Sequence, residues 1–151
     1  MAIDTIKNFL AVSDRLATAG QPTESELGEI AAAGYEAVIN LGLLDPRYCL
    51  ANEAVAVAWL GLRYHHIPVQ FDAPTLENFA AFVDAMDAHD GQKVFVHCAA
   101  NYRVSSFVAV YGEMKLGWSR GEADACARFL WPLNDTWTQF LEAARSKFLK
   151  G

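Results

Sequence analysis

The chain has 151 residues, of which 53% are hydrophobic and 20% charged, so we expect one domain over residues 1–151 with a sizeable core. Its formal net charge of −6 leaves no broad basic surface, which argues against nucleic acid or a membrane as a partner. No 18-residue apolar run or signal peptide is visible and three cysteines are irregularly spaced, which favours a cytoplasmic protein without a disulfide framework.

The first elements are marked by local signals. Residues 7–19 alternate loosely in polarity, which predicts a small hairpin at a sheet edge. Thr23 with Glu26 forms a capping box, and Gly34 predicts the end of the helix that follows. The next elements, in chain order, are predicted as a strand over 35–41, a loop over 42–49, a helix over 50–60, a strand over 62–69 and a helix capped by Thr75.

The last third of the chain is mostly helical. Ser119 with Glu122 forms a second capping box, and Asn134–Asp135 is expected to cap the final helix. Strands that alternate with helices indicate βαβ units. We therefore predict an α/β fold with a central, mostly parallel sheet flanked by helices and followed by a C-terminal helical tail.

The most informative stretch runs from Lys93 to Phe107. An apolar, β-rich run to His97 predicts a buried strand, and a helix is expected beyond Arg103. The loop between them, which opens with Cys98, can aim backbone N–H groups inward and bind a tetrahedral anion. The same positive field favours the thiolate form of Cys98, and the guanidinium of Arg103 can bind two anion oxygens.

Four segments together resemble a known group of enzymes: AGQPT (19–23), VINL (38–41), YHHIPVQFDAPT (64–75) and VHCAANYRVS (96–105). The chain resembles the cysteine-dependent protein tyrosine phosphatase superfamily in its compact dual-specificity form. More narrowly, it is similar to a small bacterial phosphatase-like family once known only as a domain of unknown function. The resemblance implies a dual-specificity phosphatase-like fold and hydrolysis of phosphate monoesters through a phosphocysteine.

The resemblance also implies a set of roles. Cys98 would be the nucleophile, Arg103 the phosphate clamp and Asp72 the general acid, although Asp72 is also typical of a solvated turn. His97 would orient the loop from behind, and Asn40 would support it from the neighbouring strand. The rest of the phosphate-binding loop would be Ala99, Ala100, Asn101, Tyr102, Val104 and Ser105, with Ser105 donating a hydrogen bond to the thiolate.

The loop departs from the superfamily pattern. Four residues separate Cys98 from Arg103, where the superfamily has five, so Val104 occupies the arginine's usual place. We therefore expect a weakened phosphatase, because small placement errors lower rates strongly. Two alternatives stay open: a rhodanese-like sulfurtransferase with a persulfide on Cys98, whose loop has this shorter length, and a phosphate-binding module without turnover. Asn101 stands where glycine is common, which Asn tolerates because it adopts the left-handed conformation readily.

No metal or cofactor is expected. His65 and His66 are adjacent in a predicted strand and point to opposite faces, so at most one of them can join His97. The expected partner is a phosphorylated small molecule or a phosphoprotein, and the sequence leaves the oligomeric state open. Asp135, near Trp131–Pro132, is the second candidate for the general acid, although a helix-cap role is favoured for it.

Overall fold

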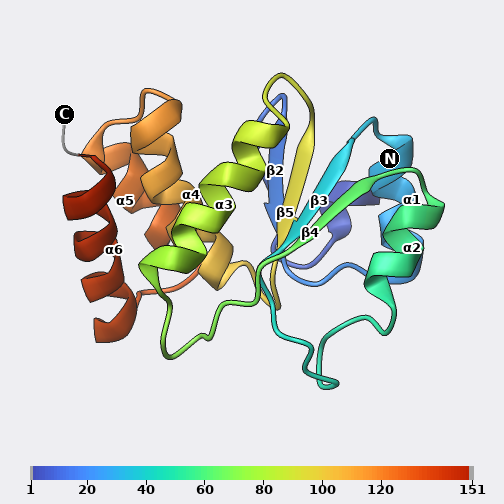
Figure 1. Cartoon of the computed structure of the whole chain (residues 1–151), viewed down its shortest axis with the longest axis horizontal. Coiled ribbons are helices and arrows are strands. Elements are labelled where there is room, and N and C mark those ends of the chain that lie inside the picture. The colour runs from blue at the N-terminus through green and yellow to red at the C-terminus, as the bar shows by residue number, and fades with distance from the viewer. Residues whose placement is uncertain (1, 150–151) are drawn as a thin grey trace.

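The structure is a computed structural model that describes residues 2–149 (Figure 1). Its elements are a 3₁₀ helix η1 (Ala2–Thr5), strands β1 (Leu10–Ser13), β2 (Leu16–Ala19), β3 (Ala37–Asn40), β4 (Arg63–His66) and β5 (Val94–His97), and helices α1 (Glu24–Ala32), α2 (Glu53–Trp59), α3 (Leu76–Ala88), α4 (Tyr102–Lys115), α5 (Arg120–Arg128) and α6 (Asp135–Phe148). None of the helices within these residues is long and apolar enough to cross a membrane.

The strands form one sheet in the order β1-β2-β5-β3-β4. β1 pairs with β2 in the antiparallel sense, which confirms the predicted edge hairpin. β2, β5, β3 and β4 pair in parallel, so their carboxyl ends lie at the same edge of the sheet. The predicted α/β fold with a mostly parallel sheet is confirmed, and β5, which carries the cysteine motif, is the central strand.

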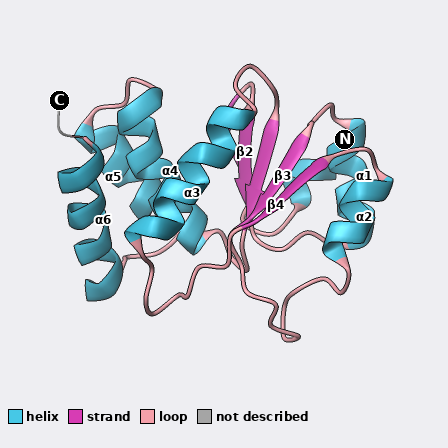
Figure 2. Ribbon diagram, in the orientation of Figure 1, coloured by secondary structure: helices cyan, strands magenta, loops and turns pink. Residues whose placement is uncertain are grey.

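Helices cover both faces of this sheet (Figure 2). α1 and α2 cover one face, and α3, α4, α5 and α6 gather on the other (Figure 1). Side chains alternate along β5: Val94 and Val96 belong to the core on the α3–α6 side, whereas Phe95 belongs to the core on the α1–α2 side. By the same alternation, Cys98 joins the α3–α6 core, and His97 points toward α2.

The capping signals fix most helix starts. Thr23 and Ser119 each cap a helix through a complete capping box, and Thr75 does the same with Asn78 in place of a glutamate. The strands predicted over 35–41 and 62–69 are shorter in the structure, Ala37–Asn40 and Arg63–His66. Two helix starts also differ from the prediction. The helix expected over 50–60 begins only at Glu53, because its N-cap, Asn52, is left-handed with φ 59°. The cap of α6 is Asn134 alone, since Asp135 lies inside the first turn.

Candidate active site

Cys98 follows the last residue of the central strand, and its residue surface is only 1% exposed. Its amide N–H donates to the carbonyl of Ala19 on β2 at 3.3 Å, which continues the parallel pairing one residue past β5. The chain then turns through residues 99–101 into α4. The cysteine therefore sits where the parallel strands end, the usual ligand-binding edge of an open α/β sheet.

The carbonyl groups of the loop after Cys98 are held by hydrogen bonds from segments earlier in the chain. The Ala99 carbonyl accepts from the Gln21 amide at 3.0 Å, and the Ala100 carbonyl accepts from the Asn8 side chain at 2.9 Å. Gly20 allows this close approach, because a Cβ there would lie 2.6 Å from the Ala99 oxygen. Among the described residues neither alanine amide has a partner of its own, so these N–H groups are available to an anion.

Asn101 gives the loop its exit angle. It adopts the left-handed conformation with φ 70°, as its residue type predicted, and makes no side-chain cap to α4. Instead its Nδ2 donates to the Asn8 carbonyl at 2.9 Å and to Thr18 Oγ1 at 3.0 Å. The first amides of α4 therefore keep their hydrogens toward the loop, where the helix dipole also favours negative charge.

Three neighbouring side chains are fixed by other contacts. Ser105 was expected to donate to the thiolate, but its hydroxyl donates to the Asn101 carbonyl one turn earlier, at 2.5 Å. Val104, which occupies the superfamily arginine's place in the count, is fully buried in the core. Tyr102 stacks on Trp131 with ring centroids 4.8 Å apart. Arg103 is therefore the one charged side chain that the first turn of α4, residues 102–105, offers to the site.

Arg103 is buried and lacks an anionic partner. The residue is 7% exposed, and its guanidinium makes no hydrogen bond or ion pair with any residue from 2 to 149. Its contacts are the rings of Tyr48 and Phe71, whose centroids lie 6.0 and 5.5 Å from Cζ. A buried cation without a counter-charge is costly, so this position is poised for an incoming anion.

Asp72 lies on a loop, with its side chain exposed, directly after Phe71 in sequence. Its neighbour Phe71 packs over Arg103, and the Phe71 carbonyl accepts from the indole N–H of Trp137 at 2.7 Å. This bond ties the loop that carries Phe71 and Asp72 to helix α6. No hydrogen bond or ion pair engages the Asp72 side chain within the described chain, so its carboxyl is available.

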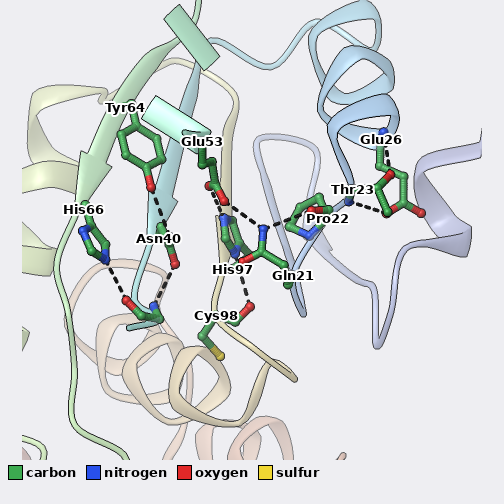
Figure 3. A network of polar contacts seen from close by, with 11 residues as sticks. Gln21, Pro22, Thr23, Glu26, Asn40, Glu53, Tyr64, His66, His97 and Cys98 are labelled. Atoms are coloured by element: carbon green, nitrogen blue, oxygen red, sulfur yellow. Dashed lines mark hydrogen bonds and ion pairs between the residues drawn. The ribbon is translucent and has the colours of Figure 1, made fainter. Parts of the chain in front are cut away.

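A polar chain lies behind the loop, on the opposite face of the sheet (Figure 3). His97 Nε2 lies 2.6 Å from Glu53 Oε2, and its Nδ1 lies 3.2 Å from the Cys98 carbonyl oxygen. Gln21 Nε2 donates to Glu53 Oε1 at 2.8 Å. The expectation that His97 orients the loop from behind agrees with these contacts. Figure 3 also shows the Cys98 sulfur pointing away from the imidazole.

Asn40 supports the site indirectly. Its Oδ1 accepts from the Gly42 amide at 2.8 Å, and its Nδ2 donates to the Tyr64 hydroxyl at 3.0 Å. His66 Nε2 lies 2.7 Å from the Gly42 carbonyl oxygen. A Cβ on Gly42 would lie 3.6 Å from Cys98 Cα, so the turn that Asn40 holds lies against the cysteine. Asn40 therefore shapes a neighbouring turn and does not bond to the loop.

The remaining ionisable candidates lie elsewhere. His65 contacts His89, with their Nε2 atoms 2.7 Å apart, in the lining of a hollow of about 770 Å³ that contains none of the predicted site residues. Residues 2–149 include no cluster of three His, Cys, Asp or Glu side chains able to hold a metal ion. Burial raises the pKa of the Cys126 thiol to about 11, which makes it a poor nucleophile.

Comparison with known proteins bears directly on this geometry. A family described as "DSP-PTPase phosphatase fused to NAD+ Kinase" matches residues 7–132, which include every strand and the whole cysteine loop. The chain belongs to this phosphatase family. A DUF442 phosphatase-like protein from Shewanella putrefaciens CN-32 has 31% sequence identity and a TM-score of 0.87, over 97% of this chain and 96% of that one.

Other relatives are more distant or only partly comparable. A beta-lactamase hydrolase-like protein from Xylella fastidiosa is 30% identical over 117 residues, which are 76% of this chain but 27% of that protein. The chain thus spans about a quarter of the length of these curated relatives of the family. The crystal structure of kinase-associated phosphatase has a TM-score of 0.78 at 14% identity, which shows the shared fold alone.

The sequence alone did not indicate several residues of the candidate site. Glu53 was hidden inside a predicted helix, because nothing local links it to His97. Tyr48 lay in a predicted loop, yet its ring faces Arg103 and its hydroxyl accepts from the Leu43 amide at 2.8 Å. Asn8 gave no signal beyond its residue type. Gln21 lies in the AGQPT segment that carries the resemblance, but nothing in that segment predicts its bond to Glu53.

Proposed function

We propose that this protein is a cysteine-dependent hydrolase of phosphate monoesters that works through a phosphocysteine on Cys98. The observation that carries the proposal is the buried guanidinium of Arg103, which has no anion of its own and lies five residues after a buried cysteine. Membership of a phosphatase family supports the same chemistry. A phosphate dianion would supply the missing counter-charge.

The proposed reaction has two displacements. In the first, the Cys98 thiolate attacks phosphorus, the bond from phosphorus to the ester oxygen breaks, and that oxygen takes a proton from a general acid. In the second, water attacks phosphorus and gives up a proton to the same group, now a base, and the sulfur–phosphorus bond breaks. The thiolate and inorganic phosphate result. Arg103 and the free loop amides would stabilise the equatorial oxygens in both steps.

We propose Asp72 as the general acid. Its loop lies over Arg103 through Phe71 and is tied to α6 through Trp137, and its carboxyl is not engaged elsewhere. Asp72→Asn should slow esters of poor leaving groups far more than esters of good ones, because a good leaving group departs unprotonated. An equal loss on both esters would assign the acid to another group, and Asp135→Asn is the next variant to test.

The deciding experiment offers the purified protein 4-nitrophenyl phosphate and, in separate reactions, thiosulfate with cyanide. Release of nitrophenol that Cys98→Ser abolishes and Cys126→Ser preserves would support the phosphatase. Thiocyanate formation without phosphate ester hydrolysis would identify a sulfurtransferase with a persulfide on Cys98. Saturable binding of inorganic phosphate with neither reaction would identify a module that binds phosphate without turnover.

The short loop deserves its own test, because the sequence predicts that it weakens catalysis. Exchanging Arg103 with Val104 restores the superfamily spacing. However, Val104 is fully buried against the α3–α6 core, so an arginine there has to enter apolar surroundings. We now expect the exchange to lower the yield of folded protein and not to raise activity. If the exchange variant folds and is more active than the wild type, the native spacing between Cys98 and Arg103 weakens catalysis.

The substrate is proposed only by class, as a phosphorylated small molecule or a phosphoprotein. A pocket of about 330 Å³ adjoins the loop at Ala99, and its other lining residues include Lys7, Pro22, Tyr48 and Leu50. We propose it as the place of the leaving group. A cytoplasmic location stays a prediction.

A further inference from the structure

Behind the cysteine, a carboxylate and an imidazole are buried together. Glu53 is 5% exposed and His97 is fully buried, and the two side chains meet at 2.6 Å. Glu53 is the first residue of α2, whereas Cys98 projects to the other face of the sheet, toward α4. The pair therefore cannot touch a substrate at the cysteine. It reaches the site through the Cys98 carbonyl and through Gln21, whose side chain bonds to Glu53 and whose amide bonds to the Ala99 carbonyl.

The hydrogen-bond geometry of His97 favours a ring that is protonated on both nitrogens. Both ring nitrogens face oxygen acceptors: Nε2 faces the Glu53 carboxylate at 2.6 Å and Nδ1 faces the Cys98 carbonyl at 3.2 Å. A neutral imidazole has only one N–H to donate, so serving both acceptors requires the imidazolium form. A buried imidazolium in turn requires a nearby negative charge, and Glu53 supplies it.

The surroundings keep that negative charge on Glu53. Burial by itself would raise the pKa of Glu53, but the hydrogen bond and charge of His97, the hydrogen bond from Gln21 and the charge of nearby His66 outweigh it. The pKa is therefore held below its ordinary value. The other titratable group facing this carboxylate is Tyr64, and burial raises the pKa of that phenol to about 12, so it stays neutral at ordinary pH.

We propose that Glu53 is a positioning residue for the cysteine chemistry: it holds His97 as an imidazolium that fixes the Cys98 peptide and places a positive charge behind the thiolate. The effect is electrostatic as well as geometric, because a fixed positive charge beside the Cys98 peptide favours the thiolate form. This inference rests on the proposed function for its biological meaning. Its test, however, needs no phosphate ester.

The two parts of the role can be separated by one substitution. Glu53→Gln keeps the shape and can still donate to Nε2 of a neutral His97, whose Nδ1–H continues to bond to the Cys98 carbonyl. The peptide stays in place, but the positive charge is lost. Glu113→Gln is the matched control, since Glu113 also makes a 2.6 Å ion pair, with Arg145, and its side chain is 11% exposed.

The experiment measures the rate of iodoacetamide alkylation of each cysteine at pH 6 by peptide mass spectrometry. Glu53→Gln should slow alkylation of Cys98 about tenfold, because a positive charge that favours the reactive thiolate is lost, whereas Glu113→Gln should leave the rate unchanged. Equal Cys98 rates in the wild type and in folded Glu53→Gln would overturn the proposal. If Glu53→Gln does not fold, Gln21→Met replaces it: a two- to threefold slowing supports the proposal and an unchanged rate refutes it.

The same data separate this inference from the proposed function. Slower alkylation in Glu53→Gln with no hydrolysis of aryl phosphates by the wild type would support the role of Glu53 and reject the phosphatase. Hydrolysis by the wild type with unaltered alkylation in the variant would do the reverse. In the wild type, the contribution of Glu53 to stability should be present above the ordinary glutamate pKa and lost as pH falls through its lowered value.

Discussion

Two arginines are buried to almost the same extent in this protein, and their surroundings are opposite. Arg145 in α6 is 9% exposed and bonds to two carboxylates, Glu113 at 2.6 Å and Asp124 at 2.8 Å. Arg103 in α4 is 7% exposed and bonds to none within residues 2–149. The first lies between helices, and the second lies over the carboxyl ends of the strands.

The difference is between a charge that the fold neutralises and a charge that it leaves unpaired. Taking a guanidinium out of water is unfavourable unless other groups satisfy it, and the protein satisfies Arg145 itself. It leaves Arg103 with the faces of two aromatic rings, which attract a cation but give no hydrogen bond. A side chain kept in this state costs stability, and such positions are typical of binding sites. Four predictions test the contrast.

The largest effect should be on catalysis. Arg103→Ala should lower kcat/KM for 4-nitrophenyl phosphate by about a hundred- to a thousandfold, because the guanidinium supplies charge-assisted hydrogen bonds that strengthen in the transition state. Arg145→Ala, assayed on its folded fraction, should stay within about twofold of the wild type. Steady-state kinetics at matched folded concentrations measures both. Comparable losses in the two variants would erase the distinction between the arginines.

The next effect concerns stability, and here the Arg145 variant should lose more than the Arg103 variant. Arg145→Met should lower the free energy of unfolding by about 3 kcal/mol, because it leaves the Glu113 carboxylate buried and unpaired. Arg103→Met should be neutral or stabilising, since it removes an unsatisfied buried charge. Urea denaturation followed by tryptophan fluorescence gives both values. The double variant Arg145→Met with Glu113→Gln should recover part of the loss.

A smaller effect should appear on adding an anion. Inorganic phosphate at ten times its dissociation constant should stabilise the wild type by about 1.4 kcal/mol through linkage. Arg103→Ala should lose most of this stabilisation, and Arg145→Ala should keep it. Thermal unfolding with and without phosphate, at constant ionic strength, provides the measurement. Stabilisation that survives in Arg103→Ala would mean that the loop amides alone bind the anion.

The smallest effect concerns the ring over Arg103. Phe71→Leu should reduce kcat/KM about two- to fivefold, the equivalent of about 0.5–1 kcal/mol for a lost cation–π contact. The matched control is Phe129→Leu, because Phe129 is 70% exposed and does not contact Arg103. Both variants are assayed with the same aryl phosphate. A loss far beyond fivefold would mean that Phe71 also positions the neighbouring acid loop.

The sequence was sufficient where the determining residues lie close together along the chain. The two predicted capping boxes, at Thr23 and Ser119, the left-handed Asn101 and the order of strands and helices follow from spacings of a few residues. The contrast between the arginines did not follow, because Arg145 meets partners 32 and 21 residues away. No local pattern says which of two arginines will find a carboxylate.

The candidate site divides in the same way. Cys98 and Arg103 were predictable, since a strand, a short loop and a helix place them together within a few residues. Glu53 was not, because its meeting with His97 depends on how α2 packs on the sheet, 44 residues away in sequence. The hydroxyl of Ser105 was assigned to the thiolate from its position in the motif, but the helix offers it a nearer acceptor in the Asn101 carbonyl.

The reciprocal bonds between Asn8 and the loop at Ala100 and Asn101 have a consequence for how the protein matures. They join residues 92 and 93 positions apart, so the loop cannot take its shape until the N-terminal hairpin has docked beside β5. Contacts this distant in sequence form late in folding, because closing a long loop is entropically unfavourable. In a nascent or partly folded chain we therefore expect Cys98 to react as an ordinary thiol, and any reactivity that the loop confers on it to appear only as folding is completed.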